Sequence, residues 1–209
     1  MALLLVALGV ALTGLAGYAL ARGRQPAAAQ AVGTAAALLR AAPGMSYTLQ
    51  SEGAFGLTLA VDWRARPHLM RVTGEVRSGA GATAVAYWLD GDDLYVRDPG
   101  SGIWRMRRGG AGLPEVAALL PANVAQRLQA AAAGAQPVGT ARTEGGEVVW
   151  AYVLPGQGRL LLRRKTLAPL LWESSLEGGG SLALQWHGLN IPPGLSLPAS
   201  VQRDATAAP

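Results

Sequence analysis

The sequence contains no cysteine, one lysine, one phenylalanine and two histidines among its 209 residues. The absence of cysteine excludes disulfides, thiol catalysis, cysteine-ligated zinc and lipidation of a processed N-terminal cysteine. His68 and His187 have no metal ligands or acid–base partners at a suitable spacing, and no serine lies in a nucleophile-elbow sequence. We therefore expect no catalytic residue, no metal and no cofactor, and we expect that the protein is not an enzyme.

Charged residues are also few, at 15% of the chain against 50% hydrophobic residues, and the formal net charge is +5. A net positive charge is suited to binding nucleic acid or anionic lipid. The basic residues are scattered and no nucleic-acid-binding motif accompanies them, so we expect no nucleic-acid partner. Two basic groups are compatible both with contact to anionic headgroups and with a charged sheet edge: Arg105, Arg107 and Arg108, and Arg163, Arg164 and Lys165.

One long apolar run is present at the N-terminus, where residues 2–21 carry no charge and Arg22 and Arg24 follow. Ala19-Leu20-Ala21 has the small-x-small pattern that signal peptidase accepts, which indicates a cleaved signal peptide. The run is also long enough to span a bilayer, and no Lys or Arg precedes it, which favours an uncleaved anchor. Residues 1–24 are therefore either a signal peptide or a membrane anchor, and both place the remainder outside the cytoplasm, in the periplasm or cell envelope.

The rest of the chain predicts one domain over residues 28–200, followed by a disordered tail over residues 201–209. Helical spacing of apolar residues predicts a helix over 28–42, and Pro43-Gly44 ends it. The period then changes to two, and Asp90-Gly91 marks a tight hairpin. A helical insert is expected over 113–120 and 122–133, with Pro114 and Pro121 near the helix starts. The expected strands are 46–52, 57–64, 68–77, 83–89, 94–98, 103–107, 138–143, 147–154, 159–164, 170–176 and 181–189.

This order of elements predicts an α+β fold in which helices lie on one face of a meandering antiparallel sheet. A sheet of so many strands twists and curls. The pattern therefore predicts a strongly curved sheet with an N-terminal helix and a helical insert.

Several segments, taken in order, resemble LolA-type lipoprotein carriers. Trp63-Arg64-Ala65-Arg66-Pro67, followed by Met70-Arg71-Val72, is similar to the strand-to-strand corner of that family. Residues 90–99 resemble the next hairpin, in which an Asp-Gly turn leads to an aromatic strand and an Asp-Pro exit. The helical insert, Leu167-Ala168-Pro169 and Leu189-Asn190 follow at the expected places, although the final strand is short and rich in proline.

The resemblance implies an unclosed half-barrel with helices as a lid over an apolar cavity. Relatives of the LolA-type carriers include mycobacterial lipid-binding lipoproteins and RseB-type sensor domains. In the carriers, an arginine just before the proline of the corner latches the lid by hydrogen bonds, and Arg66 is the matching position here.

Candidate lipid-binding residues come from the strands with the clearest alternation and from the tryptophans. Leu57, Leu59, Val61 and Trp63 share one face of a strand, as do Leu182, Leu184 and Trp186. Because tryptophan equally anchors ordinary cores, cavity lining and core packing remain alternatives for each aromatic residue. The further candidates are Trp88, Tyr95, Trp104, Trp150 and Tyr152.

The sequence thus predicts a non-catalytic extracytoplasmic carrier that binds the acyl chains of lipids or lipoproteins in an apolar groove under a helical lid. The expected partners are this cargo and either a membrane surface or a membrane-bound donor or acceptor protein, and the carrier is expected to be a monomer. The alternative is a membrane-anchored sensor or scaffold with the same fold and a filled core.

Overall fold

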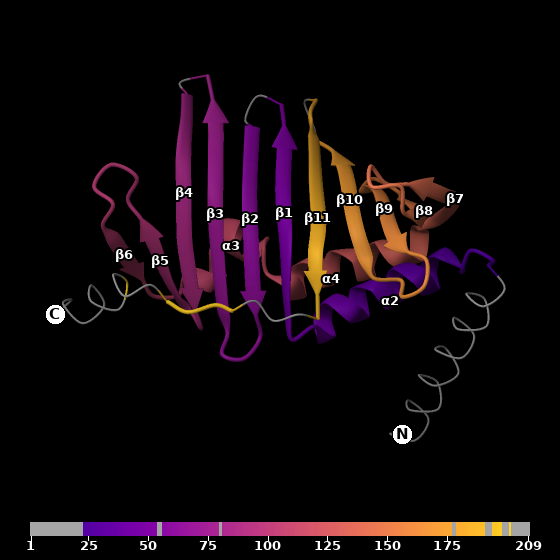
Figure 1. Cartoon of the computed structure of the whole chain (residues 1–209), viewed down its shortest axis with the longest axis horizontal. Coiled ribbons are helices and arrows are strands. Elements are labelled where there is room, and N and C mark those ends of the chain that lie inside the picture. Colours follow the sequence, from indigo (N-terminus) through magenta and orange to yellow (C-terminus); the bar gives the residue numbers. More distant parts are fainter. Residues whose placement is uncertain are drawn as a thin grey trace.

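The computed structural model describes residues 23–53, 56–79, 81–176, 179–190, 194–197 and 201. Their strands form one 11-stranded sheet in the order β6-β5-β4-β3-β2-β1-β11-β10-β9-β8-β7. Figure 1 shows this sheet from the face that does not carry the helices, which we call the outer face. Every neighbouring pair is antiparallel. The two edge strands, β6 and β7, do not pair with each other, so the sheet is not closed into a barrel.

The elements follow one another along the chain as two meanders with a helical segment between them. The first part comprises α2 (Ala28–Ala41), β1 (Gly44–Glu52), β2 (Gly56–Arg64), β3 (Leu69–Ser78), β4 (Gly81–Asp90), β5 (Asp93–Arg97) and β6 (Trp104–Arg107). The middle comprises η1 (Gly110–Gly112), α3 (Pro114–Ala117), α4 (Pro121–Ala131) and η2 (Ala132–Gly134). The last part comprises β7 (Gln136–Arg142), β8 (Val148–Leu154), β9 (Gly158–Arg163), β10 (Pro169–Ser175) and β11 (Ser181–Leu189).

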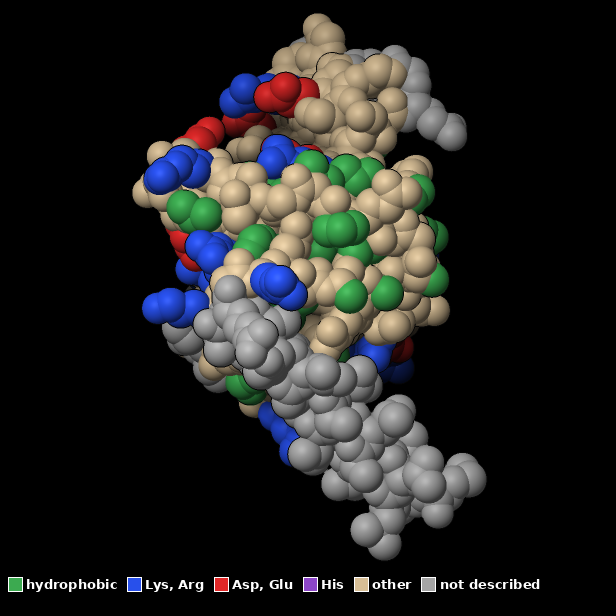
Figure 2. All heavy atoms as spheres, turned by 90° about the vertical axis from the view of Figure 1, so that its right-hand side faces the viewer, with side chains coloured by type: hydrophobic (Ala, Val, Ile, Leu, Met, Phe, Trp, Pro, Cys, Tyr) green, Lys and Arg blue, Asp and Glu red, His purple; other side chains and the backbone are tan. Residues whose placement is uncertain are grey.

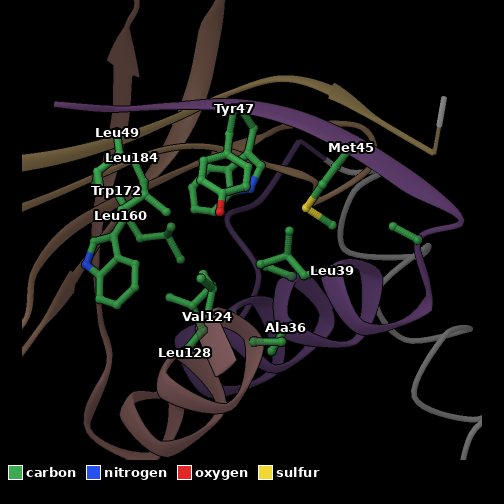
Figure 3. Packing of buried hydrophobic residues seen from close by; sticks show 14 of the residues in the cluster. Ala36, Leu39, Met45, Tyr47, Leu49, Val124, Leu128, Leu160, Trp172 and Leu184 are labelled. Atoms are coloured by element: carbon green, nitrogen blue, oxygen red, sulfur yellow. The ribbon is translucent and has the colours of Figure 1, made fainter. Parts of the chain in front are cut away.

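The helices all lie behind the sheet in Figure 1, on the face that we call the inner face. The buried side of α2 is made of Ala31, Val32, Ala35, Ala36 and Leu39, and its small residues let α4 approach closely. From α4, Val124, Ala125 and Leu128 are buried. In Figure 3, Val124 and Leu128 face the strand residues from below, beside Ala36 and Leu39. The helices cover the lower part of the inner face, and β1–β4 and β11 continue upward beyond them (Figure 1).

Alternation along the strands sorts their side chains between the two faces. On β1, Met45, Tyr47 and Leu49 are buried, whereas Gln50 and Thr48 on the other face are more exposed. The buried inner-face residues join those of α2 and α4 in one large cluster, which forms the main core.

A second apolar cluster lies on the outer face of the sheet. It comprises Leu69, Trp88, Tyr95, Leu195 and Val201, with Trp104 and Leu197 packed against it. We call it the outer cluster. Leu195 belongs to residues 194–197, which cross the front of the sheet in Figure 1, and Val201 lies further along the chain. These residues therefore cover an apolar patch that would otherwise face water.

The edge strand β7 is almost free of charge, with Arg142 at its end, and Val138 is 58% exposed. Figure 2 faces this end of the molecule and shows hydrophobic side chains spread over it, with basic side chains mainly near the margin. Pro137 cannot donate a hydrogen bond to an added strand, and the register shifts between Pro137 and Gly139. Both features protect the edge from pairing with another chain.

The predicted fold class is confirmed: helix 28–42 and every predicted strand have a counterpart within a few residues. The predicted helix over 113–120 is wrong in length, since α3 ends at Ala117. Leu120 is extended, with φ −68° and ψ 132°, because the following Pro121 disfavours the helical conformation at the residue before it.

The predicted signal peptide or anchor lies outside the described residues except for Gly23 and Arg24. No helix in the described part of the chain is both long and apolar enough to cross a membrane. Of the predicted tail 201–209, only Val201 is described, and it is 1% exposed in the outer cluster.

Candidate functional site

Two of the predicted apolar groups meet on the inner face, on either side of β1. In the register of β1 with its neighbours, Tyr47 lies between Val61 and Trp186, and Leu49 lies between Leu59 and Leu184. Ser51 in turn lies between Leu57 and Leu182. We call Leu57, Leu59, Val61 and Trp63 of β2 together with Leu182, Leu184 and Trp186 of β11 the central stripe. Its two halves are far apart in the sequence and become neighbours because the first and last strands pair.

The middle of the central stripe is covered by the helical insert. The Tyr47 hydroxyl donates a hydrogen bond to the main-chain oxygen of Leu119, between α3 and α4. The Tyr47 ring lies 6.5 Å from the Trp186 ring, centroid to centroid. Leu59, Val61, Leu184 and Trp186 are buried, whereas Leu57 and Leu182 are only half-buried. Burial therefore decreases towards the upper end of the stripe, where the strands extend past the helices.

A cavity of about 250 Å³ opens beside α4 at this end. Trp172 of β10 and Leu182 and Leu184 of β11 form its apolar wall, and Arg127 of α4 also lines it. The Arg127 guanidinium carbon is 5.4 Å from the centroid of the Trp172 ring. Trp172 is held in place because its indole Nε1 donates a 2.7 Å hydrogen bond to the main-chain oxygen of Gln157. In Figure 3, Trp172 lies at the left of the main core cluster, next to Leu160 and Leu184.

Two tyrosine hydroxyls beneath the helices are shielded from water. Burial raises the pKa of Tyr47 well above its usual value, and neighbouring Tyr87 adds to this shift. Burial also raises the pKa of Tyr152 to about 12, although its contact with Gln25 opposes this. The Tyr152 hydroxyl donates a 3.2 Å hydrogen bond to the main-chain oxygen of Pro26, just before α2. Both hydroxyls thus attach helical segments to the sheet in their neutral form.

We expect the protein to lose stability in alkali from about pH 10 upward. Because the folded-state pKa of Tyr152 lies above the value of about 10 for an unfolded chain, the unfolded state releases its proton first. The free energy of unfolding therefore keeps this contribution below about pH 10 and falls as the pH rises towards about 12. Urea denaturation across this range measures the fall, and Tyr152→Phe should make it shallower. An equally steep fall in Tyr152→Phe would contradict the assignment to this residue.

Comparisons with known proteins bear on the fold. No protein-family model matches the sequence, and no curated protein matches it. Among solved structures, the chain is similar to LprF from Mycobacterium bovis, with a TM-score of 0.61 and 9% identity, over 84% of this chain and 98% of LprF. The fold of the chain is therefore similar to that of LprF. At this identity the likeness concerns the fold alone.

Two further solved structures are similar to the chain with lower scores. An uncharacterized conserved protein from Thermus thermophilus has a TM-score of 0.45 and 13% identity, over 80% of this chain and 88% of that one. The LolA superfamily protein NE2245 from Nitrosomonas europaea has a TM-score of 0.32 and 10% identity, over 85% of this chain and 97% of that one.

The lid latch that the LolA-type resemblance implies for Arg66 stays a prediction. Arg66 is exposed in the turn between β2 and β3. It takes part in none of the hydrogen bonds or ion pairs among the described residues. The residue that links the inner face to the insert is Tyr47, through its bond to Leu119.

Three predicted lining residues, Trp88, Tyr95 and Trp104, lie away from the central stripe. Trp88 and Tyr95 are opposite each other in the register of β4 and β5 and belong to the outer cluster, with Trp104 packed against it. Of the two alternatives that the sequence leaves open for these aromatic residues, their place in the outer cluster favours core packing over lining of the groove. Leu89 and Tyr87, their neighbours on β4, are the residues that face the main core.

The remaining two candidates, Trp150 and Tyr152 of β8, face the inner side near the start of α2. Tyr152 is fully buried, and Trp150 is 4% exposed beneath the Arg164 guanidinium, whose carbon is 4.6 Å from the Trp150 ring centroid. Both belong to the main core cluster, but three strands separate β8 from β1. They pack the far side of the core and do not join the central stripe.

Two polar residues of the cavity, Arg127 and Gln157, were not among the candidates from the sequence. Arg127 is an exposed residue of the amphipathic helix α4, and an arginine at such a position is usually a solvated side chain. Gln157 lies in the turn between β8 and β9. Neither has a motif around it, and only the approach of α4 to β10 brings them to one cavity. In the described part of the chain, no group of three or more His, Asp or Glu side chains is placed to hold a metal ion.

Proposed function

We propose that this protein binds the acyl chain of a lipid or an acylated protein on the upper part of its inner face and carries it outside the cytoplasm. The observation that supports this most is that the central stripe continues past the helices. Leu57 and Leu182 are half-buried there, and the cavity beside α4 is walled by Trp172, Leu182 and Leu184. These groups offer an apolar surface and no reacting group, as a carrier requires.

The energetics of such binding are favourable without any catalytic group. Burying one methylene gains about 0.8 kcal/mol, so a long acyl chain offers on the order of 10 kcal/mol before ordering costs. The cavity of about 250 Å³ is slightly smaller than typical ligand sites of roughly 300–1,000 Å³. It therefore accommodates the end of a chain, and a complete acyl group requires α4 to move away from β10. The α4 helix would then act as the lid.

A second candidate function is a membrane-anchored sensor or scaffold with a filled core. The packing beneath the helices favours it, because Leu39, Leu128, Leu160 and Leu162 are each 0% exposed. In this case the central stripe would serve stability alone, and no lipid would bind. The N-terminal apolar run would serve as the anchor in the sensor and as a signal or an anchor in the carrier.

We expect Leu182→Asp to abolish lipid uptake, because it places a carboxylate on the apolar wall of the cavity. The measurement is native mass spectrometry of the full chain, purified without detergent and again after incubation with phospholipid vesicles. The wild type should carry an extra mass that organic extraction identifies as lipid, and Leu182→Asp should remain bare.

Gln185→Asp is the matched control for this variant. Gln185 is exposed on the same strand but on the opposite face of the sheet, so the same charge there should leave uptake unchanged. A wild-type protein that stays bare after incubation would reject the carrier and support the filled-core sensor. Equal uptake by wild type and Leu182→Asp would place the lipid elsewhere on the protein.

A further inference from the structure

Among the described residues that line the cavity beside α4, one side chain is charged, and its charge is positive. This side chain is Arg127, and no Asp or Glu is among the lining residues that the structure describes. Within the described residues, Arg127 forms no ion pair. Its contact is with the face of Trp172, 5.4 Å from guanidinium carbon to ring centroid. The guanidinium is thus held against an aromatic wall while its N–H donors remain available.

A second polar group lines the same cavity. The side-chain oxygen of Gln157, one of the lining residues, is buried and has no hydrogen-bond partner among the described residues. A buried acceptor without a partner costs about 1–3 kcal/mol, so a donor placed in the cavity relieves that cost. Ser174 and Ser175 add hydroxyls to the lining, and the Ser174 hydroxyl donates a 3.3 Å hydrogen bond to the main-chain oxygen of Ser175.

We infer that this cavity binds a single class of amphiphile, one whose head is anionic and carries a hydroxyl or amide donor next to the acyl chain. The acidic group lies against Arg127, the donor reaches the Gln157 oxygen, and the chain runs over Leu182 and Leu184. This inference rests on the proposed function and adds the chemical class of the lipid. Arginine suits the role because its planar fork pairs with two oxygens of a phosphate or carboxylate at once.

The same geometry disfavours lipids with a cationic head. A choline group in the cavity would bring a second positive charge close to the Arg127 guanidinium, where no described lining carboxylate can compensate it. The polar end of the cavity therefore discriminates by charge, while the apolar wall supplies affinity for any chain.

The experiment compares two lipids with the same single acyl chain, lysophosphatidylglycerol and lysophosphatidylcholine, below their micelle concentrations. Isothermal titration of the full chain measures both dissociation constants. We expect the wild type to bind lysophosphatidylglycerol about tenfold more tightly, which is the factor that corresponds to one charged hydrogen bond. Arg127→Gln should reduce the ratio to about one by weakening lysophosphatidylglycerol alone, and Arg127→Lys should keep part of the preference.

Arg108→Gln is the matched control, since it removes the same charge from an exposed position after the edge strand β6, outside the cavity lining. It should keep the wild-type ratio. Equal binding of both lipids by the wild type, or an unchanged preference in Arg127→Gln, overturns the inference and leaves the proposed function intact. Binding of neither lipid overturns the proposed function and the inference together.

Discussion

Gly74→Ala should lower the free energy of unfolding by about 3 kcal/mol or more. Gly74 lies in β3 opposite Leu59 of β2. A Cβ atom at this position would lie 2.0 Å from the main-chain oxygen of Thr58 and 2.9 Å from the Leu59 Cα. These are backbone atoms of a paired strand, so they cannot turn aside as a flexible side chain would. The new methyl group must instead push β2 and β3 apart.

Urea denaturation followed by far-ultraviolet circular dichroism measures this loss, and Gly188→Ala supplies the control. Gly188 is also within a strand, β11, but a Cβ there would meet no atom within 4 Å. Its replacement should be neutral or stabilise by up to about 1 kcal/mol, as removal of glycine from a strand does. If the two variants were equally stable, the close approach of β2 and β3 at Gly74 would be refuted.

The position of Gly74 also accounts for part of the shape of the sheet. It alternates with Met70 and Val72 on the inner face of β3, where both neighbours are buried in the main core. A glycine on that face lets the adjacent backbone approach without a side chain between them. Glycines of this kind let a sheet bend towards the side on which they lie, and here that side carries the helices.

Most of the fold was predictable because it depends on local patterns. Leu57, Leu59 and Val61 alternate with polar or small residues, and this period of two defines a strand and its buried face without tertiary information. The Asp90-Gly91 turn and the prolines at 114 and 121 likewise determine local backbone geometry. The pairing of β1 with β11 was not predicted, since nothing in either strand specifies a partner so distant in sequence.

The faces of β4 and the polar end of the cavity were not predictable for a related reason. Both faces of β4 are apolar near its end, with Tyr87 and Leu89 on one side and Trp88 on the other. Which side belongs to the core depends on the helices, and what covers the other side depends on Leu195 and Val201. Arg127 and Trp172 are similarly brought together only by the docking of α4. Long-range packing decided each case.

Trp88→Ala should therefore destabilise the protein by about 3–5 kcal/mol while leaving lipid binding unchanged. Trp88 is 6% exposed and packs with Leu69, Tyr95 and the C-terminal Leu195 and Val201 on the outer face, in a cluster separate from the central stripe. Urea denaturation measures the loss, and titration with lysophosphatidylglycerol at a temperature where the variant is folded measures binding.

Trp186→Ala on the inner face is the comparison, since its ring packs against Tyr47 at the centre of the stripe. It should lose a similar amount of stability and also bind lipid more weakly, because a cavity forms beneath the site.

A double-mutant cycle of Trp88→Ala with Leu195→Ala should give a coupling energy of at least about 0.5 kcal/mol if Leu195 covers the outer cluster in solution. Additive effects would show that Leu195 does not contact Trp88 in solution. Weaker lipid binding in Trp88→Ala would show that this tryptophan does line the lipid site, as the sequence predicts.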